Sequence, residues 1–351
     1  MTTSPDAVFT QQLGRDVLLQ RSLSEERPSY DPLLNALALP LHETFYPRGF
    51  PISIHTNSPE VLAAAAESWS ETVQLFSVPT IRLEFGVLPG LASHPLTVPT
   101  CRSRENLLCT AADAQNFSIC DLRRGFGFCW LSEHAVANHA YLRYHFLEAA
   151  ALCLVTAKYL TPIHGACVAW RGHGILLCGE SGAGKSSLSF ACARHGWTFV
   201  SDDATCLLRS RKGRAVIGNP QHLHFRESAL ELFPDLQHIP LRPRINGDIS
   251  IELPTESYAG IQTAREADVD FVLFLNRQAG VLPSIRPFLR SSAMSYLSQF
   301  LCYGEKQMRQ KQKKSLTNLL SAEVLEFHYS DLDPAVEFLQ RLVESKADAS
   351  D

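Results

Sequence analysis

The sequence predicts an α/β protein in which a small α+β domain precedes a larger domain built on a mixed sheet. The chain has 351 residues, which exceeds the length at which single cores usually stop growing. Short extended runs and one short helix fill its first part. From about residue 160, strands and helices alternate around a glycine-rich loop. The expected parts are a flexible arm (1–30), a small α+β domain (31–145), a phosphate-loop domain (146–343) and a disordered tail (344–351).

Composition limits the partners. Acidic residues exceed basic ones by 36 to 32, so no global positive field points to nucleic acid or an anionic membrane. The most apolar long segment, 146–160, contains two charged residues and is too short to cross a bilayer. No secretory leader opens the chain, and the ten cysteines form no C-x-x-C pair. We therefore expect a cytoplasmic protein with reduced, scattered thiols.

The first half of the chain contains several local signals. Ser58 and Pro59 are typical of a helix start, before the run VLAAAAESW. A longer helical pattern covers residues 134 to 160, and Pro162 ends it. A short apolar run at 50–54 precedes the helix start at Ser58. Extended runs, separated by Gly, Pro and Asp or Asn, predict strands at 80–88, 106–110 and 125–131.

The second half predicts a strand, loop, helix, strand unit. A hairpin of residues 165–170 and 174–178 leads into the loop, a helix follows to about His195, and WTFVS (197–201) is extended. Later signals predict a hairpin at 205–218, a second hairpin around Asn246-Gly247 and a buried central strand at 271–275. Two helices, at about 292–320 and 333–343, flank the strand VLEFHY.

The loop GESGAGKS matches the template G-x-x-x-x-G-K-[ST]. In such a loop, backbone N–H groups and a helix start face phosphate groups, the lysine neutralises their charge, and the serine hydroxyl reaches a magnesium ion. A glycine-rich turn that binds nothing is the alternative, but the strand before the loop and the helix after it favour phosphate binding. The expected nucleotide-binding residues are Gly179, Glu180, Ser181, Gly182, Ala183, Gly184, Lys185, Ser186 and Ser187.

Two carboxylates, Asp202 and Asp203, follow the next strand. A right-handed crossover makes that strand parallel to the strand before the loop, so both open on the same sheet edge, where ligands of such sheets bind. Alone, an Asp-Asp pair often just opens a turn. Beside a phosphate loop, one carboxylate suits magnesium and the other suits a base for a phosphoryl acceptor.

The run from His164 to Asp203 resembles the catalytic half of the HPr kinase/phosphorylase family of bacterial serine kinases. There a His-Gly precedes a strand hairpin, the loop reads close to G-[DE]-S-G-x-G-K-S, and a helix leads to a paired Asp-Asp. The resemblance implies the phosphoenolpyruvate-carboxykinase-like P-loop fold, with ATP and Mg²⁺ as cofactors. It further implies that Lys185 holds the β- and γ-phosphates, that Ser186 and Asp203 serve the magnesium, that Asp202 is the base, and that His164 contacts phosphate or shares a proton.

The sequence departs from this family in two places. The family has a further glutamate and an R-G-L-G segment, for which Glu227 or Glu231 is a candidate replacement here, and the first 130 residues do not resemble the family's N-terminal domain. Arg242 and Arg244 are either a phosphate clamp or, as the better interpretation, solvated hairpin residues. Likewise, the basic run 306–314 either docks an acidic acceptor or forms a solvated helix face.

We expect an ATP- and Mg²⁺-dependent kinase that phosphorylates a serine-type hydroxyl of a protein, a peptide or a small molecule. A nucleotide-binding regulatory module with little transferase activity, and a plain nucleotide hydrolase, remain as alternatives, because all three keep the phosphate loop. ATP and pyrophosphate both remain open as donors. A homo-oligomer is compatible with the sequence.

Overall fold

The computed structural model describes residues 37–89, 95–209, 213–243, 249–301 and 304–348. The chain divides into two units, Met1–Ala38 and Leu39–Asp351. All the elements that follow belong to the second unit. The arm expected at residues 1–30 lies outside the described residues. No helix of the described part is long and apolar enough to cross a membrane.

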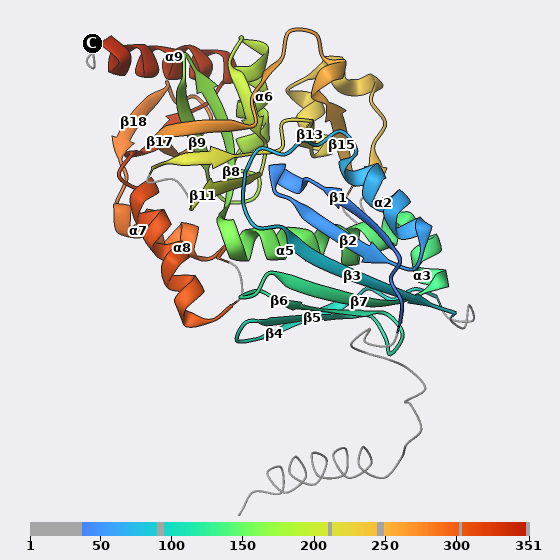
Figure 1. Ribbon diagram of the computed structural model, residues 1–351. Coiled ribbons are helices and arrows are strands. Elements are labelled where there is room, and N and C mark those ends of the chain that lie inside the picture. Colours follow the sequence, from blue (N-terminus) through green and yellow to red (C-terminus); the bar gives the residue numbers. More distant parts are fainter. Residues whose placement is uncertain (1–36, 90–94, 210–212, 244–248, 302–303, 349–351) are drawn as a thin grey trace, which may run out of the picture. The chain divides into compact units, whose positions relative to one another are not determined.

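The first half of this unit is built on a seven-stranded sheet with the strand order β1-β2-β3-β7-β6-β5-β4 (Figure 1). The strands expected at 80–88, 106–110 and 125–131 are confirmed as β3, β5 and β7, and the apolar run at 50–54 leads into β2. Three strands were missed, among them β4, whose sequence TCRSR is exposed throughout and has no apolar face. The bounds are β1 Leu41–Phe45, β2 Ile52–Thr56, β3 Ile81–Leu88, β4 Thr100–Arg104, β5 Leu107–Ala111, β6 Phe117–Asp121 and β7 Phe126–Ser132.

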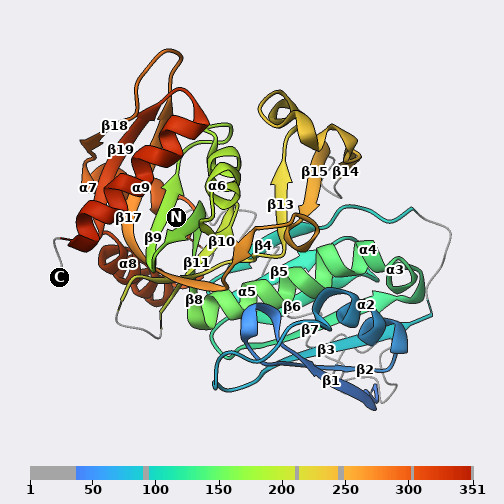
Figure 2. The ribbon, with the colours of Figure 1, turned by 90° about the horizontal axis from the view of Figure 1, so that it is seen from above.

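Helices cover one face of this sheet (Figure 2). The helix α2 has Ser58 at its N-cap position and Pro59 at its first position, as expected, although the Ser58 side chain makes no capping bond. The long helix expected at 134–160 is interrupted at Asn138, whose side chain caps the next turn, and by a π-helical turn. The helical segments are α2 Pro59–Trp69, α3 Glu133–Ala137, α4 His139–Leu142, the π-turn Arg143–Leu147 and α5 Glu148–Tyr159.

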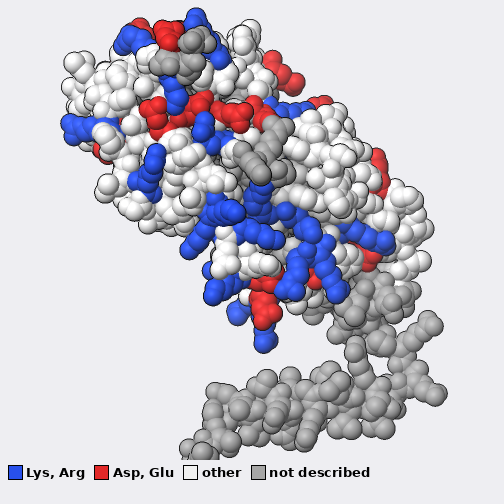
Figure 3. Space-filling view, turned by 60° about the vertical axis from the view of Figure 1, so that its left-hand side comes forward, with Lys and Arg blue, Asp and Glu red and all other residues white. Residues whose placement is uncertain are grey.

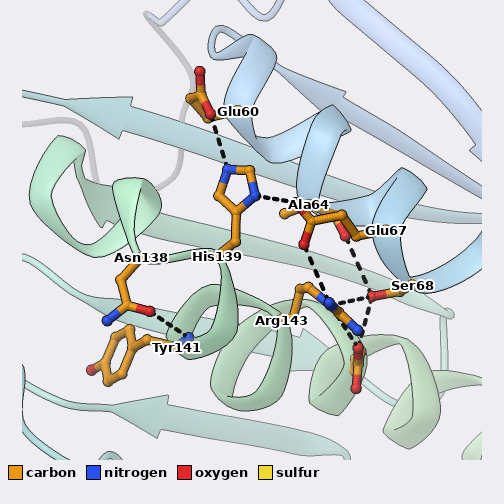
Figure 4. Close-up of polar contacts among 9 residues, drawn as sticks. Glu60, Ala64, Glu67, Ser68, Asn138, His139, Tyr141 and Arg143 are labelled. Carbon is orange, nitrogen blue, oxygen red and sulfur yellow. Dashed lines mark hydrogen bonds and ion pairs between the residues drawn. The ribbon is translucent and has the colours of Figure 1, made fainter.

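A polar network ties α2 to these segments (Figure 4). His139 lies between two carboxylates, with Nδ1 2.6 Å from Glu67 and Nε2 2.9 Å from Glu60. Arg143 donates to Glu67 at 3.2 Å and to Ser68 Oγ at 2.8 Å. The hydrogen bonds with Glu67 and Glu60 raise the pKa of His139 above its usual 6.5. The bond with His139 in turn lowers the pKa of Glu67 below its usual 4.5.

The network predicts a pH-dependent contribution to stability. Because the pKa of His139 is raised on folding, its contribution is complete below pH 6.5 and is lost as the pH rises through the folded-state pKa. The contribution of Glu67 is complete above pH 4.5 and is lost as the pH falls through its lowered pKa. We expect His139→Gln to lower the melting temperature most between these two values and less in alkaline buffer. A Tm difference that is constant across pH would contradict this assignment.

The second half contains a nine-stranded mixed sheet (Figure 1). The predicted α/β class with a mixed sheet is confirmed. The strand FVLFL is central, as expected, because β17 pairs with β9, β12 and β19. The bounds are β8 Leu160–Trp170, β9 His173–Cys178, β10 Thr198–Ser201, β11 Ala204–Leu208, β12 Ala215–Ile217, β16 Gln262–Thr263, β17 Glu266–Arg277, β18 Ser284–Pro287 and β19 Glu323–Tyr329.

Helices lie on both faces of the nine-stranded sheet, with α6 and α9 on one side and α7 and α8 on the other (Figure 1). The single helix expected at 292–320 is wrong, because α7 ends at Ser298 and α8 begins at Lys306. The disorder expected from residue 344 is wrong as far as Asp348, since α9 continues to that residue, and 349–351 lie outside the described residues. The helix bounds are α6 Lys185–Arg194, α7 Arg290–Ser298, α8 Lys306–Leu319 and α9 Leu332–Asp348.

A small three-stranded sheet, ordered β13-β15-β14, and short 3-10 turns stand beside the larger sheet. Its strands β14 and β15 are the two arms of the hairpin expected around Asn246-Gly247, whose turn lies outside the described residues. The remaining bounds are β13 His222–Phe225, β14 Arg242–Pro243, β15 Ile249–Pro254, η1 Pro47–Gly49, η3 Glu227–Glu231, η4 Pro234–His238 and η5 Thr255–Ser257.

One hydrophobic core joins the first sheet to part of the second. It includes Leu83 of β3 and Leu154 of α5 together with Cys206 and Leu208 of β11. The helix α5 therefore packs with the N-terminal sheet, although it leads directly into β8. The domain boundary between residues 145 and 146 stays a prediction.

Candidate functional site

The topology brings the phosphate loop and the paired carboxylates to one edge of the nine-stranded sheet. Strand β8 pairs antiparallel with both β9 and β10, so the latter two run in the same direction with β8 between them. Gly165 of β8 is opposite Cys178, the last residue of β9, and Cys167 is opposite Ser201, the last residue of β10. The loop after β9 and the carboxylates after β10 therefore emerge side by side, as the crossover argument predicts.

The loop between β9 and α6 has glycine at three positions of positive φ, the first of which is Gly179. Gly182 has φ 90° and Gly184 has φ 94°, in the left-handed region that side chains disfavour. A Cβ on Gly184 would also lie 2.8 Å from the Tyr329 hydroxyl. The loop is therefore specified both by its own glycines and by β19, whose last residue is Tyr329.

Lys185 is enclosed by this loop and is only 6% exposed. Its Nζ donates to the carbonyl oxygens of Gly179 at 2.8 Å and Glu180 at 3.3 Å, and lies 3.1 Å from His164 Nε2. Burial lowers the pKa of Lys185, and the nearby Asp203 carboxylate partly opposes that shift. The ammonium group is thus held at the point where the loop closes.

His164 links Lys185 to Asp203. Its Nδ1 lies 2.8 Å from Asp203 Oδ1, while its Nε2 faces the Lys185 ammonium. Since an ammonium group can only donate, Nε2 accepts and the ring proton is on Nδ1, where it is donated to the carboxylate. The backbone supports this chain, because Gly165 N–H donates to the carbonyl of Asp203 at 2.9 Å. All three predicted residues therefore lie in one hydrogen-bonded row.

Asp202 has a different environment from its neighbour. It is 7% exposed, and its Oδ2 accepts from the backbone N–H of His224 at 2.7 Å and from His224 Nδ1 at 2.9 Å. The Asp203 side chain, in contrast, is 54% exposed. Each carboxylate has its own histidine, His164 of β8 for Asp203 and His224 of β13 for Asp202.

Three further residues approach the site from distant parts of the chain, and the sequence did not single them out. His224 lies on β13. Arg226 follows it, and its Nη2 donates to Ser181 Oγ at 2.6 Å. Arg48, in the turn after β1, donates to the carbonyl of Ala204, next to Asp203, at 3.3 Å. Only Arg226 had a sequence signal. It lies in the segment after the paired carboxylates in which the family has its R-G-L-G, and this chain does not have that motif.

Helix α7 and the residues just after it contribute two aromatic side chains to the same region. The Tyr296 hydroxyl donates to the carbonyl of Gly179 at 2.6 Å and accepts from the Gly179 N–H at 3.2 Å. Burial raises the pKa of Tyr296 to about 12, so the hydroxyl keeps its proton for this bond. Phe300, just after α7, packs against the His164 ring with centroids 5.0 Å apart. Tyr296 and Phe300 thus contact two partners of the Lys185 ammonium group, Gly179 and His164 respectively.

Other predicted residues are placed as follows. Ser186 and Ser187 are half-buried in the first turn of α6, so Ser186 is available at the start of the helix. Glu227 and Glu231 are exposed in η3, and it is His224, not either glutamate, that contacts Asp202. Arg242 lies in the short strand β14, and Arg244 lies outside the described residues. In the part of the chain that is described, no three His, Cys, Asp or Glu side chains form a metal-binding group.

A comparison with known protein families covers the segment that contains this site. Residues 157–231 match the family model described as HPr Serine kinase C-terminal domain. This segment is similar to the C-terminal domain of HPr serine kinases. It contains His164, the phosphate loop, both carboxylates and the β13 strand with His224, so the resemblance based on the sequence is confirmed over the site itself.

Among solved structures, a match is the HPr(Ser) kinase/phosphatase from Coxiella burnetii, with 13% sequence identity and a TM-score of 0.28. The match covers 53% of this chain and 95% of that one. No curated protein matches the sequence. Arg48, Tyr296 and Phe300 lie outside the segment that matches the family model.

Proposed function

We propose that this protein is an ATP- and Mg²⁺-dependent kinase that transfers the γ-phosphoryl group to a serine-type hydroxyl of a polypeptide or small molecule. The observation that carries the proposal is that each of the two carboxylates after β10 contacts its own histidine, and that one of these histidines also contacts Lys185 of the loop. A loop that only holds a nucleotide needs the lysine and the backbone N–H groups, but has no need of two oriented carboxylates. Their presence favours transfer over simple binding.

The residues of the phosphate loop and its neighbours suit the binding of a nucleoside triphosphate. The loop has the glycine conformations of a phosphate cradle, α6 begins at Lys185, and the exposed Arg226 already reaches the loop at Ser181. Ser186 and Asp203 would hold magnesium, since one hydroxyl and one carboxylate are a usual protein share in a phosphate-bound Mg²⁺ site. Bound Mg²⁺ would neutralise charge on the phosphates.

Asp202 is assigned the base. The acceptor hydroxyl gives its proton to this carboxylate while its oxygen bonds to the γ-phosphorus, and the bond from that phosphorus to the bridging oxygen breaks to release ADP. His224 orients the carboxylate through Oδ2, which leaves Oδ1 for the acceptor. Lys185, with His164 behind it, neutralises charge that moves onto the phosphates.

A labelling experiment tests the proposal against its two rivals. The protein is incubated with γ-labelled ATP, with and without a cell extract, and the products are separated and analysed by mass spectrometry. A kinase labels a discrete extract component and gives phosphoserine or a phosphate ester, a hydrolase releases inorganic phosphate whether or not extract is present, and a regulatory module does neither. A Lys185→Ala preparation controls for contaminating kinases. Label only in inorganic phosphate would reject the kinase assignment.

The two carboxylates also predict different defects. Asp203→Asn is expected to raise the Mg²⁺ concentration needed for half-maximal rate by about ten-fold, because it removes a proposed metal ligand. Asp202→Asn leaves the Asp203 carboxylate in place and should lower the rate without shifting the Mg²⁺ requirement. The measurement is a magnesium titration of transfer at saturating ATP. An unchanged requirement in Asp203→Asn would exclude this carboxylate from the metal.

A further inference from the structure

A second concave site lies apart from the phosphate loop, where helix α8 meets the turn after β6 and the end of α5. It is a cavity of about 530 Å³, and none of the loop residues 179–187 lines it. Arg123, Lys158, Arg209, Lys311 and Lys314 line it, together with the single carboxylate of Glu305. Figure 3 shows lysine and arginine side chains gathered in one region of this face, with few acidic side chains among them.

Three of these cations already have partners within the protein. Arg123 forms an ion pair with Glu305, which lowers the pKa of that carboxyl, and Lys158 donates to the carbonyl of Arg123 at 3.0 Å. Arg209 donates to the carbonyl of Thr156 at 3.1 Å near the end of α5. These contacts neutralise the one acidic group of the cavity and hold its rim.

Lys311 and Lys314 differ from the other three. Both are exposed, and within the described part of the chain neither forms a hydrogen bond or an ion pair. They are one helical turn apart on α8, where like charges repel each other. The rest of the helix adds to this repulsion, because Arg309 and Lys313 are spaced i,i+4, and the one acidic group at the helix start, Glu305 at the N-cap, is already paired with Arg123. A bound anionic group would relieve this repulsion.

The cavity is connected to the transfer site by one strand pair. In the ladder of β8 and β11, His164 is opposite Ala204, and four residues back Leu160 is opposite Leu208. One residue further on, Tyr159 and Arg209 are joined by a backbone hydrogen bond, and both line the cavity. At about 3.3 Å per residue, His164 is therefore about 16 Å from the cavity rim. An extended chain of about five residues spans that distance.

We propose that this cavity binds an acidic segment of a polypeptide acceptor, with carboxylates at Lys311 and Lys314 and the acceptor hydroxyl at least about five residues away. The proposal rests on the kinase function above and narrows its substrate to a polypeptide. Within the basic run 306–314, Lys311 and Lys314 then recognise the acceptor, because they are the basic residues of this run that line the cavity.

The lining favours a peptide over a nucleic acid. Apolar side chains of Leu122 and Met308 lie among the cations, as suits a mixed acidic and apolar sequence. Single-stranded nucleic acid binds on free aromatic faces. The one aromatic lining residue, Tyr159, stacks on Phe50 at 5.0 Å and donates its hydroxyl to Pro79. Its ring and its hydroxyl are therefore already used in contacts within the protein.

The test measures direct binding by fluorescence anisotropy of a labelled peptide that contains one serine and a cluster of aspartates about six residues away. We expect the double variant Lys311→Gln/Lys314→Gln to bind at least about ten-fold more weakly, and binding of the wild type to weaken with added salt. The Tm of the same variant should stay equal or rise, because the substitutions remove a like-charge repulsion. Loss of binding with equal or higher stability is not expected of a merely structural pair.

Controls make the proposal falsifiable. Lys313→Gln carries one of the same charge changes on the same helix but does not line the cavity, so it should bind the peptide as the wild type does. A peptide with asparagines in place of the aspartates should bind weakly. Equal weakening in Lys313→Gln, equal affinity for the two peptides, or tighter binding of a single-stranded oligonucleotide or of anionic vesicles would each overturn the proposal. Peptide binding without phosphoryl transfer would instead reject the kinase function and leave the docking site intact.

Discussion

Replacement of Lys185 by alanine is expected to weaken ATP binding by roughly 10- to 150-fold and to abolish phosphoryl transfer. The reason is that its ammonium group makes the charge-assisted contacts of the loop, and removing such a contact costs about 1.5–3 kcal/mol. The structure adds that Nζ donates to Gly179 and Glu180 within the loop, so truncation also loosens the loop itself. Isothermal titration with ATP, alongside the labelling assay, measures both effects.

A matched control for Lys185→Ala is Lys313→Ala on the exposed face of α8, which removes a lysine far along the chain from the loop. It should leave ATP affinity and transfer within about two-fold of the wild type, as for a surface change. A circular dichroism melt of Lys185→Ala shows whether the fold survives. ATP affinity equal to the wild type in a folded Lys185→Ala protein would mean that the loop does not bind the phosphates.

Asp202→Asn is expected to lower the transfer rate by about 10²- to 10⁴-fold, the usual contribution of a positioned general base, and to keep ATP affinity within a few-fold. The geometry indicates that this substitution keeps the contact with His224 and removes only the proton-accepting oxygen. The side-chain atom that faces His224 must accept from a backbone N–H, so the asparagine oxygen takes that place. The amide NH₂ group then faces the acceptor, where it cannot take a proton.

The rate under single-turnover conditions, with ATP affinity measured in parallel, checks this expectation. His224→Gln is the companion variant, because it leaves the carboxylate in place but removes one of its two supporting bonds, and its defect should be the smaller of the two. A transfer rate in Asp202→Asn within ten-fold of the wild type would remove this residue from the role of base. The base would then have to be sought at Asp203, which has its own histidine.

The sequence predicted those parts of the site that lie within one short stretch. The strand, phosphate loop, helix and second strand follow one another, and each is specified by local chemistry: apolar strand runs, glycines with positive φ, and a helix that begins at Lys185. The position of Asp202 and Asp203 followed from the handedness of one crossover. His164 could be chosen only through resemblance, since a lone histidine has no local signature.

Tertiary structure alone decided which partners these residues have. His224 reaches Asp202 because β13 stands beside the loop, Tyr296 reaches Gly179 because α7 packs on the face of the sheet below it, and Arg48 comes from the N-terminal half. Glu227 and Glu231 match the family's glutamate in residue type, but both are exposed in η3, and it is His224 that contacts Asp202. Contacts between segments far apart in the chain depend on how sheets pair and pack, and no periodicity or spacing within a single segment encodes them.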